Sequence, residues 1–127
     1  MSYLLDTHVL IWYFEDSAEL PQRIALLIDN PSYPKFISIV SLWEIAIKLS
    51  LGKLDMQLSF DDLIDAIESS DLSVIPIKND SLKGLSNLPF IHKDPFDRLI
   101  ISTSLQESLT IITVDENIQR YEVPWLW

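Results

Sequence analysis

Short apolar runs alternate along this chain with longer stretches in which apolar residues recur at helical spacing. Runs rich in Ile, Leu, Val and Phe are typical of buried strands. Strands are expected at residues 2–6, 36–38, 74–77 and 109–114, with a short edge strand at 122–125. Helices are expected between them, at 8–14, 21–30, about 41–51, 59–67, 79–85 and 95–107. Apolar strands joined by helices predict an α/β fold with a buried parallel sheet.

Local end signals support several of these helices. Asp94 followed by Pro95 combines a capping residue with proline in the first helical position. Ser38 or Ser41 is expected to cap the helix that runs to about residue 51, and Gly52 is a candidate for its C-terminal cap. These signals place the helix ends close to the ends of the apolar runs.

Four acidic residues stand where these elements meet: Asp6, Glu44, Asp97 and Asp115. Asp6 and Asp115 end the first and fourth strands, and Glu44 and Asp97 lie on helices expected to pack near them. Ligands of parallel sheets bind beyond the carboxyl ends of the strands. Carboxylates are costly to bury unless something positive accompanies them. The four acids therefore predict a divalent cation site, and oxygen ligands suit Mg²⁺ or Mn²⁺.

Each acid also has an ordinary structural explanation. Asp6 and Asp115 could cap the helix or turn that follows each of them. Asp97 could favour the positive end of its helix, with Arg98 neutralising it, while Asp94 is better explained as the cap itself. Any one explanation is reasonable, but all four together are less so, because the acids fall at one expected edge of the sheet.

Glu44 has the strongest alternative explanation. Ser41 and Glu44 match the S-x-x-E capping box, and Lys48 follows one helical turn later as an ion-pair partner. However, the surrounding helix is apolar nearly all round and should pack on the sheet. A carboxylate in that position needs a functional reason.

The histidines give a weaker signal than the acids. His8 follows Asp6 by two residues, and His92 precedes Asp94 by two. A structural or solvated role is favoured for both over contact with a metal or phosphate.

Composition narrows the possible functions. The net charge is −10, with nine Lys and Arg, so a general nucleic-acid coat is excluded and a basic protein partner is a natural alternative. The chain has no cysteine and only Gly52 and Gly84, which argues against thiolate metal sites and glycine-rich phosphate loops. No signal peptide or membrane-length apolar run is evident. We expect one domain, residues 1–127, in a soluble cytoplasmic protein.

Four segments together resemble the motifs of the PIN domain family. They are LLDTHVL at 4–10, SLWEIAIK at 41–48, LPFIHKDPFDRLI at 88–100 and LTIITVD at 109–115. They follow one another in the family's order across almost the whole chain. Within that family the chain is most similar to VapC-type toxins of bacterial toxin–antitoxin pairs.

The resemblance implies a three-layer α/β/α fold with a parallel sheet of order 3-2-1-4-5. It also implies an endoribonuclease that depends on Mg²⁺ or Mn²⁺ and hydrolyses RNA by metal-activated water. The implied partners are a small VapB-like antitoxin, which inhibits the enzyme, and a second copy of the chain in a homodimer.

The resemblance also assigns roles to individual residues. It implies that Asp6, Glu44, Asp97 and Asp115 are both the catalytic and the metal-binding acids. It implies that Thr7 and Thr113 are hydroxyls close to the metal or phosphate, with Asp94 as a further candidate.

Two other readings remain open. A phosphatase-like hydrolase of the haloacid-dehalogenase type would want a second Asp two residues after Asp6, where this chain has His8. A catalytically silent PIN-fold binding module would act only through its partner. A phosphoacceptor receiver domain is disfavoured, because no Lys follows the strand at 109–114.

Overall fold

A parallel sheet of five strands forms the centre of the protein in a computed structural model that describes residues 1–127. The spatial order is β3-β2-β1-β4-β5, and every neighbouring pair is parallel. The strands are β1 (Tyr3–Leu5), β2 (Lys35–Ser38), β3 (Ser73–Ile75), β4 (Thr110–Ile112) and β5 (Trp125–Leu126). The predicted fold class and strand order are therefore confirmed.

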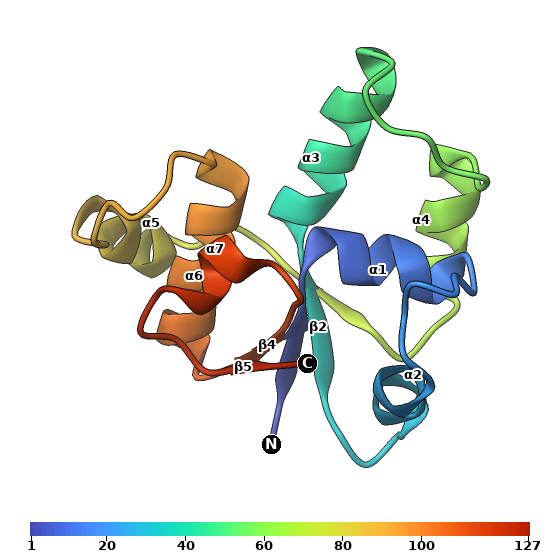
Figure 1. Ribbon diagram of the computed structural model, residues 1–127, viewed down its shortest axis with the longest axis horizontal. Helices are drawn as coiled ribbons and strands as arrows, with labels where there is room; N and C mark the ends of the chain where they lie inside the picture. The colour runs from blue at the N-terminus through green and yellow to red at the C-terminus, as the bar shows by residue number, and fades with distance from the viewer.

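Helices cover both faces of this sheet (Figure 1). The helices are α1 (Thr7–Phe14), α2 (Gln22–Asp29), α3 (Ile39–Ser50), α4 (Phe60–Glu68), α5 (Asn79–Ser86), α6 (Pro95–Glu107) and α7 (Glu116–Gln119). In Figure 1, α1 to α4 lie to one side of the strands and α5 to α7 to the other. None of them is both long and apolar enough to cross a membrane.

The alternation of side chains along each strand produces two apolar cores. Leu5 and Ile112 point into the core shared with α1 to α4, whereas their neighbours Leu4 and Ile111 point into the core shared with α6 and α7. Successive strand residues face opposite sides of the sheet. A strand that is apolar at every position must therefore be covered by helices on both faces. This explains why the apolar runs of the sequence do not alternate with polar residues.

The edge strand differs from its predicted position. Residues 122–125 were expected to form it, but β5 begins only at Trp125. The preceding residues use their amides in a turn, in which Tyr121 N donates to Ile118 O and Val123 N donates to Tyr121 O. Pairing with β4 therefore starts only where Ile111 N donates to Pro124 O.

The central strand β1 lies between β2 and β4. The chain therefore adds β2 and β3 on one side of β1 and later adds β4 and β5 on the other side. Such a reversal of strand order opens a crevice beyond the carboxyl ends of the strands. Asp6 directly follows β1 and Thr113 directly follows β4. The fold thus brings the first and last motifs of the sequence together at one point.

Candidate active site

Asp6 is fixed at the junction of β1 and α1. Its Oδ1 accepts a hydrogen bond from Thr7 N (2.7 Å), which caps α1, and its Oδ2 accepts one from the Thr113 hydroxyl (2.8 Å). The residue is only 4% exposed. The capping explanation of Asp6 is therefore correct, but capping uses one carboxylate oxygen only. The second oxygen ties β1 to the end of β4.

Glu44 reaches the same region from the middle of α3. Its Oε1 accepts a hydrogen bond from the Thr7 hydroxyl (2.8 Å), and its Oε2 forms an ion pair with Lys48 Nζ (2.5 Å). The Thr7 hydroxyl also lies 2.9 Å from Ser41 Oγ. The predicted ion pair with Lys48 is present, whereas the capping box is absent. Helix α3 is capped by Ser38, so Glu44 lies too far inside it to reach the N-terminal amides.

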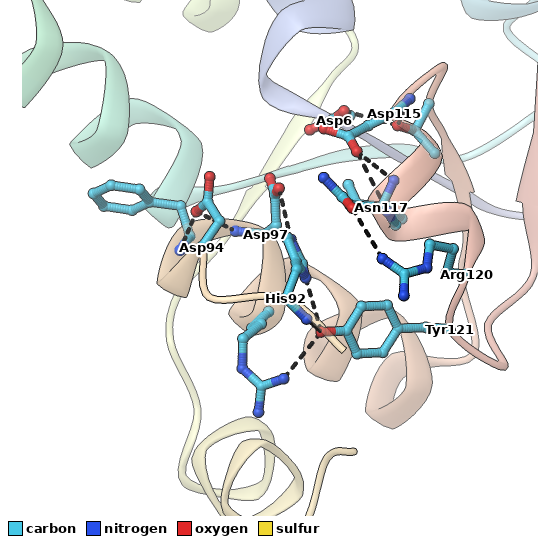
Figure 2. A network of polar contacts seen from close by, with 12 residues as sticks. Asp6, His92, Asp94, Asp97, Asp115, Asn117, Arg120 and Tyr121 are labelled. Carbon is cyan, nitrogen blue, oxygen red and sulfur yellow. Dashed lines mark hydrogen bonds and ion pairs between the residues drawn. The ribbon is translucent and has the colours of Figure 1, made fainter. Parts of the chain in front are cut away.

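Asp97 lies in the first turn of α6. Asp94 caps this helix by accepting from Phe96 N and Asp97 N, at 2.9 Å and 3.1 Å. Because Asp94 satisfies these amides, the side chain of Asp97 is free of capping. Asp97 Oδ2 lies 3.1 Å from His92 Nε2, and Oδ1 accepts no side-chain or backbone hydrogen bond and faces solvent. Figure 2 shows this carboxylate pointing toward the side where Asp6 and Asp115 lie.

Asp115 is the most exposed of the four acids and caps the short helix α7. Its Oδ1 accepts hydrogen bonds from Asn117 N (2.8 Å) and Ile118 N (3.4 Å). Its own amide donates to the Thr113 hydroxyl (3.0 Å), which in turn donates to Asp6. Thr113 therefore connects Asp115 to Asp6.

The acids influence one another electrostatically. Burial raises the pKa of Asp97 to about 8, with further contributions from the negative charges of Asp6, Asp94, Asp115 and Glu44. Burial also raises the pKa of Asp6 to about 6, against the lowering effect of hydrogen bonds from Thr113 and Thr7. Repulsion of this kind is expected among carboxylates that share one site. A bound cation would relieve it.

No three Asp, Glu or His side chains are close enough together in this structure to enclose a metal ion. The chemistry of the group nevertheless suits one. The donors are all carboxylate oxygens, which Mg²⁺ and Mn²⁺ prefer. Lys48 forms an ion pair with Glu44, and this hydrogen bond raises the pKa of Lys48. No Lys or Arg forms an ion pair with the other three acids, so a cation is still needed among them. The residues present fit a divalent cation.

Arg98 does not neutralise Asp97, contrary to the alternative suggested by the sequence. Its guanidinium donates to the carbonyls of Pro89 and Leu88 and to the Tyr121 hydroxyl. Adjacent residues on a helix do not face each other, so the side chains of Asp97 and Arg98 diverge. No sequence signal pointed to Tyr121, which contacts His92 from 29 residues away.

Comparison with known proteins identifies the fold. The family model described as PIN domain matches residues 3–124. A chain of VapBC2 from Rickettsia felis, solved bound to a DNA fragment from its promoter, is 20% identical with a TM-score of 0.72, over 99% of this chain and 98% of that one. FitAcB from Neisseria gonorrhoeae is 19% identical with a TM-score of 0.68, over 98% and 96% of the two chains. VapBC-5 from Mycobacterium tuberculosis, a member of the VapBC family of toxin–antitoxin systems, is 18% identical with a TM-score of 0.65, over 98% and 97%. No curated protein sequence matches the chain.

Proposed function

Because this chain belongs to the PIN domain family, we propose that it is a divalent-metal-dependent endoribonuclease and the toxin of a toxin–antitoxin pair. We assign its catalytic and metal-binding roles to Asp6, Glu44, Asp97 and Asp115. The structural relatives support the second half of the proposal, since VapBC-5 belongs to a family of toxin–antitoxin systems and another relative is a toxin–antitoxin complex from Klebsiella pneumoniae.

The observation that carries the proposal is the burial of two carboxyl groups that no Lys or Arg pairs with, Asp6 at the end of β1 and Asp97 at the start of α6. Asp6 and Asp97 are 4% and 8% exposed, and their pKa values are raised to about 6 and about 8. A protein that needed these positions only for stability would do better with apolar or neutral residues. Functional sites are where such perturbed groups gather.

The divalent ion, when bound, would lower the pKa of a coordinated water and stabilise negative charge on the scissile phosphate. Asp6, Glu44 and Asp97 are the residues that would hold it, with Asp115 contributing at the solvent side. The hydroxyls of Thr7 and Thr113 keep Glu44 and Asp6 in place through the 2.8 Å hydrogen bonds described above. Asp94 supports Asp97 by taking over the cap of α6.

The acidity of the chain favours a basic inhibitor. With a net charge of −10, the protein would attract a basic antitoxin segment, and an Arg of that segment could replace the metal's charge among the carboxylates. Steering by rim charges weakens with salt. An affinity for the antitoxin that does not change between low and high salt would argue instead for an apolar interface.

We also propose a homodimer acting in the cytoplasm.

The test is cleavage of a mixed RNA pool by purified, antitoxin-free protein, followed by sequencing of the cut ends. We expect cleavage with Mn²⁺, none with EDTA, and none with Asp97→Asn in either condition. Asp55→Asn serves as the matched control, because Asp55 is an exposed loop residue outside all four motifs. Cleavage that persists in EDTA, or an Asp97→Asn protein as active as the control, would contradict the proposal.

A binding module with the same fold would behave differently in cells. Asp6→Asn should abolish growth inhibition if RNA hydrolysis causes it, because the carboxylate at the end of β1 is lost. A silent module would inhibit growth unchanged. Antitoxin binding by the Asp6→Asn protein, measured in parallel, checks that the variant is folded.

A further inference from the structure

A chain of buried and partly buried polar contacts leads from Asp97 away from the acidic group. It consists of His92, Tyr121 and Arg98, and it approaches Asp97 from the side opposite to Asp6 (Figure 2). Tyr121 and Arg98 are 5% and 7% exposed, so these polar groups depend on one another for hydrogen bonds. The contacts have a defined direction, which follows from counting donors and acceptors.

The phenol oxygen of Tyr121 has its acceptor capacity filled. Arg98 Nη1 donates to it at 3.0 Å, and the backbone amide of His92 donates to it at 3.2 Å. A phenol has one proton to give. That proton is left for the remaining neighbour, His92 Nδ1, at 2.8 Å. Nδ1 of His92 is therefore an acceptor.

This arrangement fixes the tautomer of His92. A neutral imidazole with an unprotonated Nδ1 carries its proton on Nε2. Nε2 lies 3.1 Å from Asp97 Oδ2, so the ring donates a hydrogen bond to that oxygen. Oδ1 of Asp97 is left for other partners. The carboxylate thus has one oxygen held by the protein and one available on the side of the acidic group.

Arg98 anchors the far end of the chain. Its Nη1 also donates to Pro89 O at 2.9 Å, its Nη2 donates to Leu88 O at 3.3 Å, and its guanidinium lies 4.5 Å from the ring centre of Phe90. A guanidinium has donors only. It therefore cannot accept the phenol proton, and the direction of the chain cannot reverse.

We infer that His92 is a positioning residue for Asp97, with Tyr121 and Arg98 fixing its Nε2–H tautomer. The role in positioning a metal-binding carboxylate rests on the proposed function, whereas the tautomer does not. Partners that orient metal-binding groups commonly change metal affinity by about 10- to 100-fold when they are removed.

The tautomer can be measured directly in the metal-free protein. In protein carrying ¹⁵N-labelled histidine, long-range ¹H–¹⁵N correlation in EDTA distinguishes a protonated from an unprotonated ring nitrogen, and a His8→Gln variant assigns the two histidines. We expect His92 to have Nε2 protonated and Nδ1 unprotonated, and Tyr121→Phe to give a mixture. An Nδ1–H tautomer, or a wild-type ring already mixed, overturns the inference.

Two substitutions of His92 test the positioning role. The amide nitrogen of Gln reaches about as far as Nε2, whereas that of Asn reaches only as far as Nδ1, so His92→Gln can still donate to Asp97 and His92→Asn cannot. We expect His92→Asn to weaken Mn²⁺ binding at least tenfold by titration calorimetry, with a matching fall in kcat for RNA, and His92→Gln to lose far less. Equal losses in both variants, or none in either, contradict the role.

Two controls separate the possible outcomes. Asp55→Asn changes an exposed loop residue and should leave Mn²⁺ affinity unchanged. The free energy of unfolding of each variant identifies any that fails to fold, in which case the tautomer of the wild type decides the inference. A wild-type protein that neither binds Mn²⁺ nor cleaves RNA overturns the proposed function and the positioning role together, and the tautomer measurement still tests the hydrogen-bond chain.

Discussion

The metal-free protein should lose stability as the pH rises, because Asp97 binds a proton more tightly in the folded state than in the unfolded one. Its pKa rises from 3.8 to about 8 on folding, chiefly through burial. Between these values the folded state holds a proton that the unfolded state lacks, so the free energy of unfolding falls as pH increases. This is opposite in sign to the usual behaviour of a carboxylate in an ion pair.

The size of the effect follows from the pKa. Each pH unit within the window is worth about 1.4 kcal/mol per proton, so raising the pH from about 5.5 to about 8 should remove about 3 kcal/mol through Asp97. Asp6, with a pKa of about 6, titrates mostly at the lower end of that range. Loss of the Asp6 proton over the same range should remove about 1 kcal/mol more from the free energy of unfolding.

The assay is urea unfolding in EDTA at several pH values, for the wild type and for Asp97→Asn. The variant should keep its fold, because Asp94 caps α6. It should retain only the smaller part of the pH dependence, which comes from Asp6, and should be the more stable protein at pH 8. Asp55→Asn should follow the wild type. A wild-type stability that is flat from pH 5.5 to 8, or an Asp97→Asn slope equal to that of the wild type, would refute the electrostatic reasoning.

Three further substitutions probe separate features. Asp71→Ala should lower the free energy of unfolding by about 2 kcal/mol, because it leaves the buried amino group of Lys35 without its charged partner. Lys35 lowers the pKa of Asp71, so urea unfolding should show the difference between variant and wild type shrinking on acidification. Gly84→Ala should lower the free energy of unfolding by about 1–3 kcal/mol in the same assay, because the new Cβ would lie 2.6 Å from a side-chain oxygen of α6. This clash should outweigh the better helix propensity of Ala. A gain in stability would contradict the close packing of α5 against α6. Lys48→Met should tighten Mn²⁺ binding several-fold by calorimetry, since no cation then competes for Glu44 Oε2, and weaker binding would show that Lys48 supports the site.

The elements and the strand order could be predicted from the sequence because local signals and burial agree. Asp94 and Pro95 start α6 where expected, and Gly52 has the positive φ of 65° that suits a residue just beyond a helix. The capping box at Ser41 failed for a definite reason. The S-x-x-E pattern is local, whereas the start of α3 is set by where β2 stops pairing, and Ser38 occupies that position.

The surroundings of the acids were less accessible to sequence reasoning. A pattern can place Asp97 at the start of a helix, but it cannot show that Arg98 turns away or that Tyr121 lies beside His92. Tyr121 reaches that position because the turn after α7 folds it into the core of Leu4, Ile100 and Ile111. Contacts of this kind depend on the packing of distant segments, and burial of the polar groups then determines their hydrogen bonds.

The proposed metal should also act as a cross-link between the two layers of the protein. Asp6 and Glu44 are held from the α1 and α3 side of the sheet, whereas Asp97 comes from α6 on the other side (Figure 1). An ion bound by acids from both layers stabilises only the folded state. At a free ion concentration about 100 times its Kd, it should add about 2.7 kcal/mol to the free energy of unfolding. Thermal unfolding of the wild type should therefore shift upward with Mn²⁺, and Asp97→Asn should lose most of that shift. An equal shift in the wild type and in Asp97→Asn would place the ion elsewhere on the protein and would remove Asp97 from the metal-binding group.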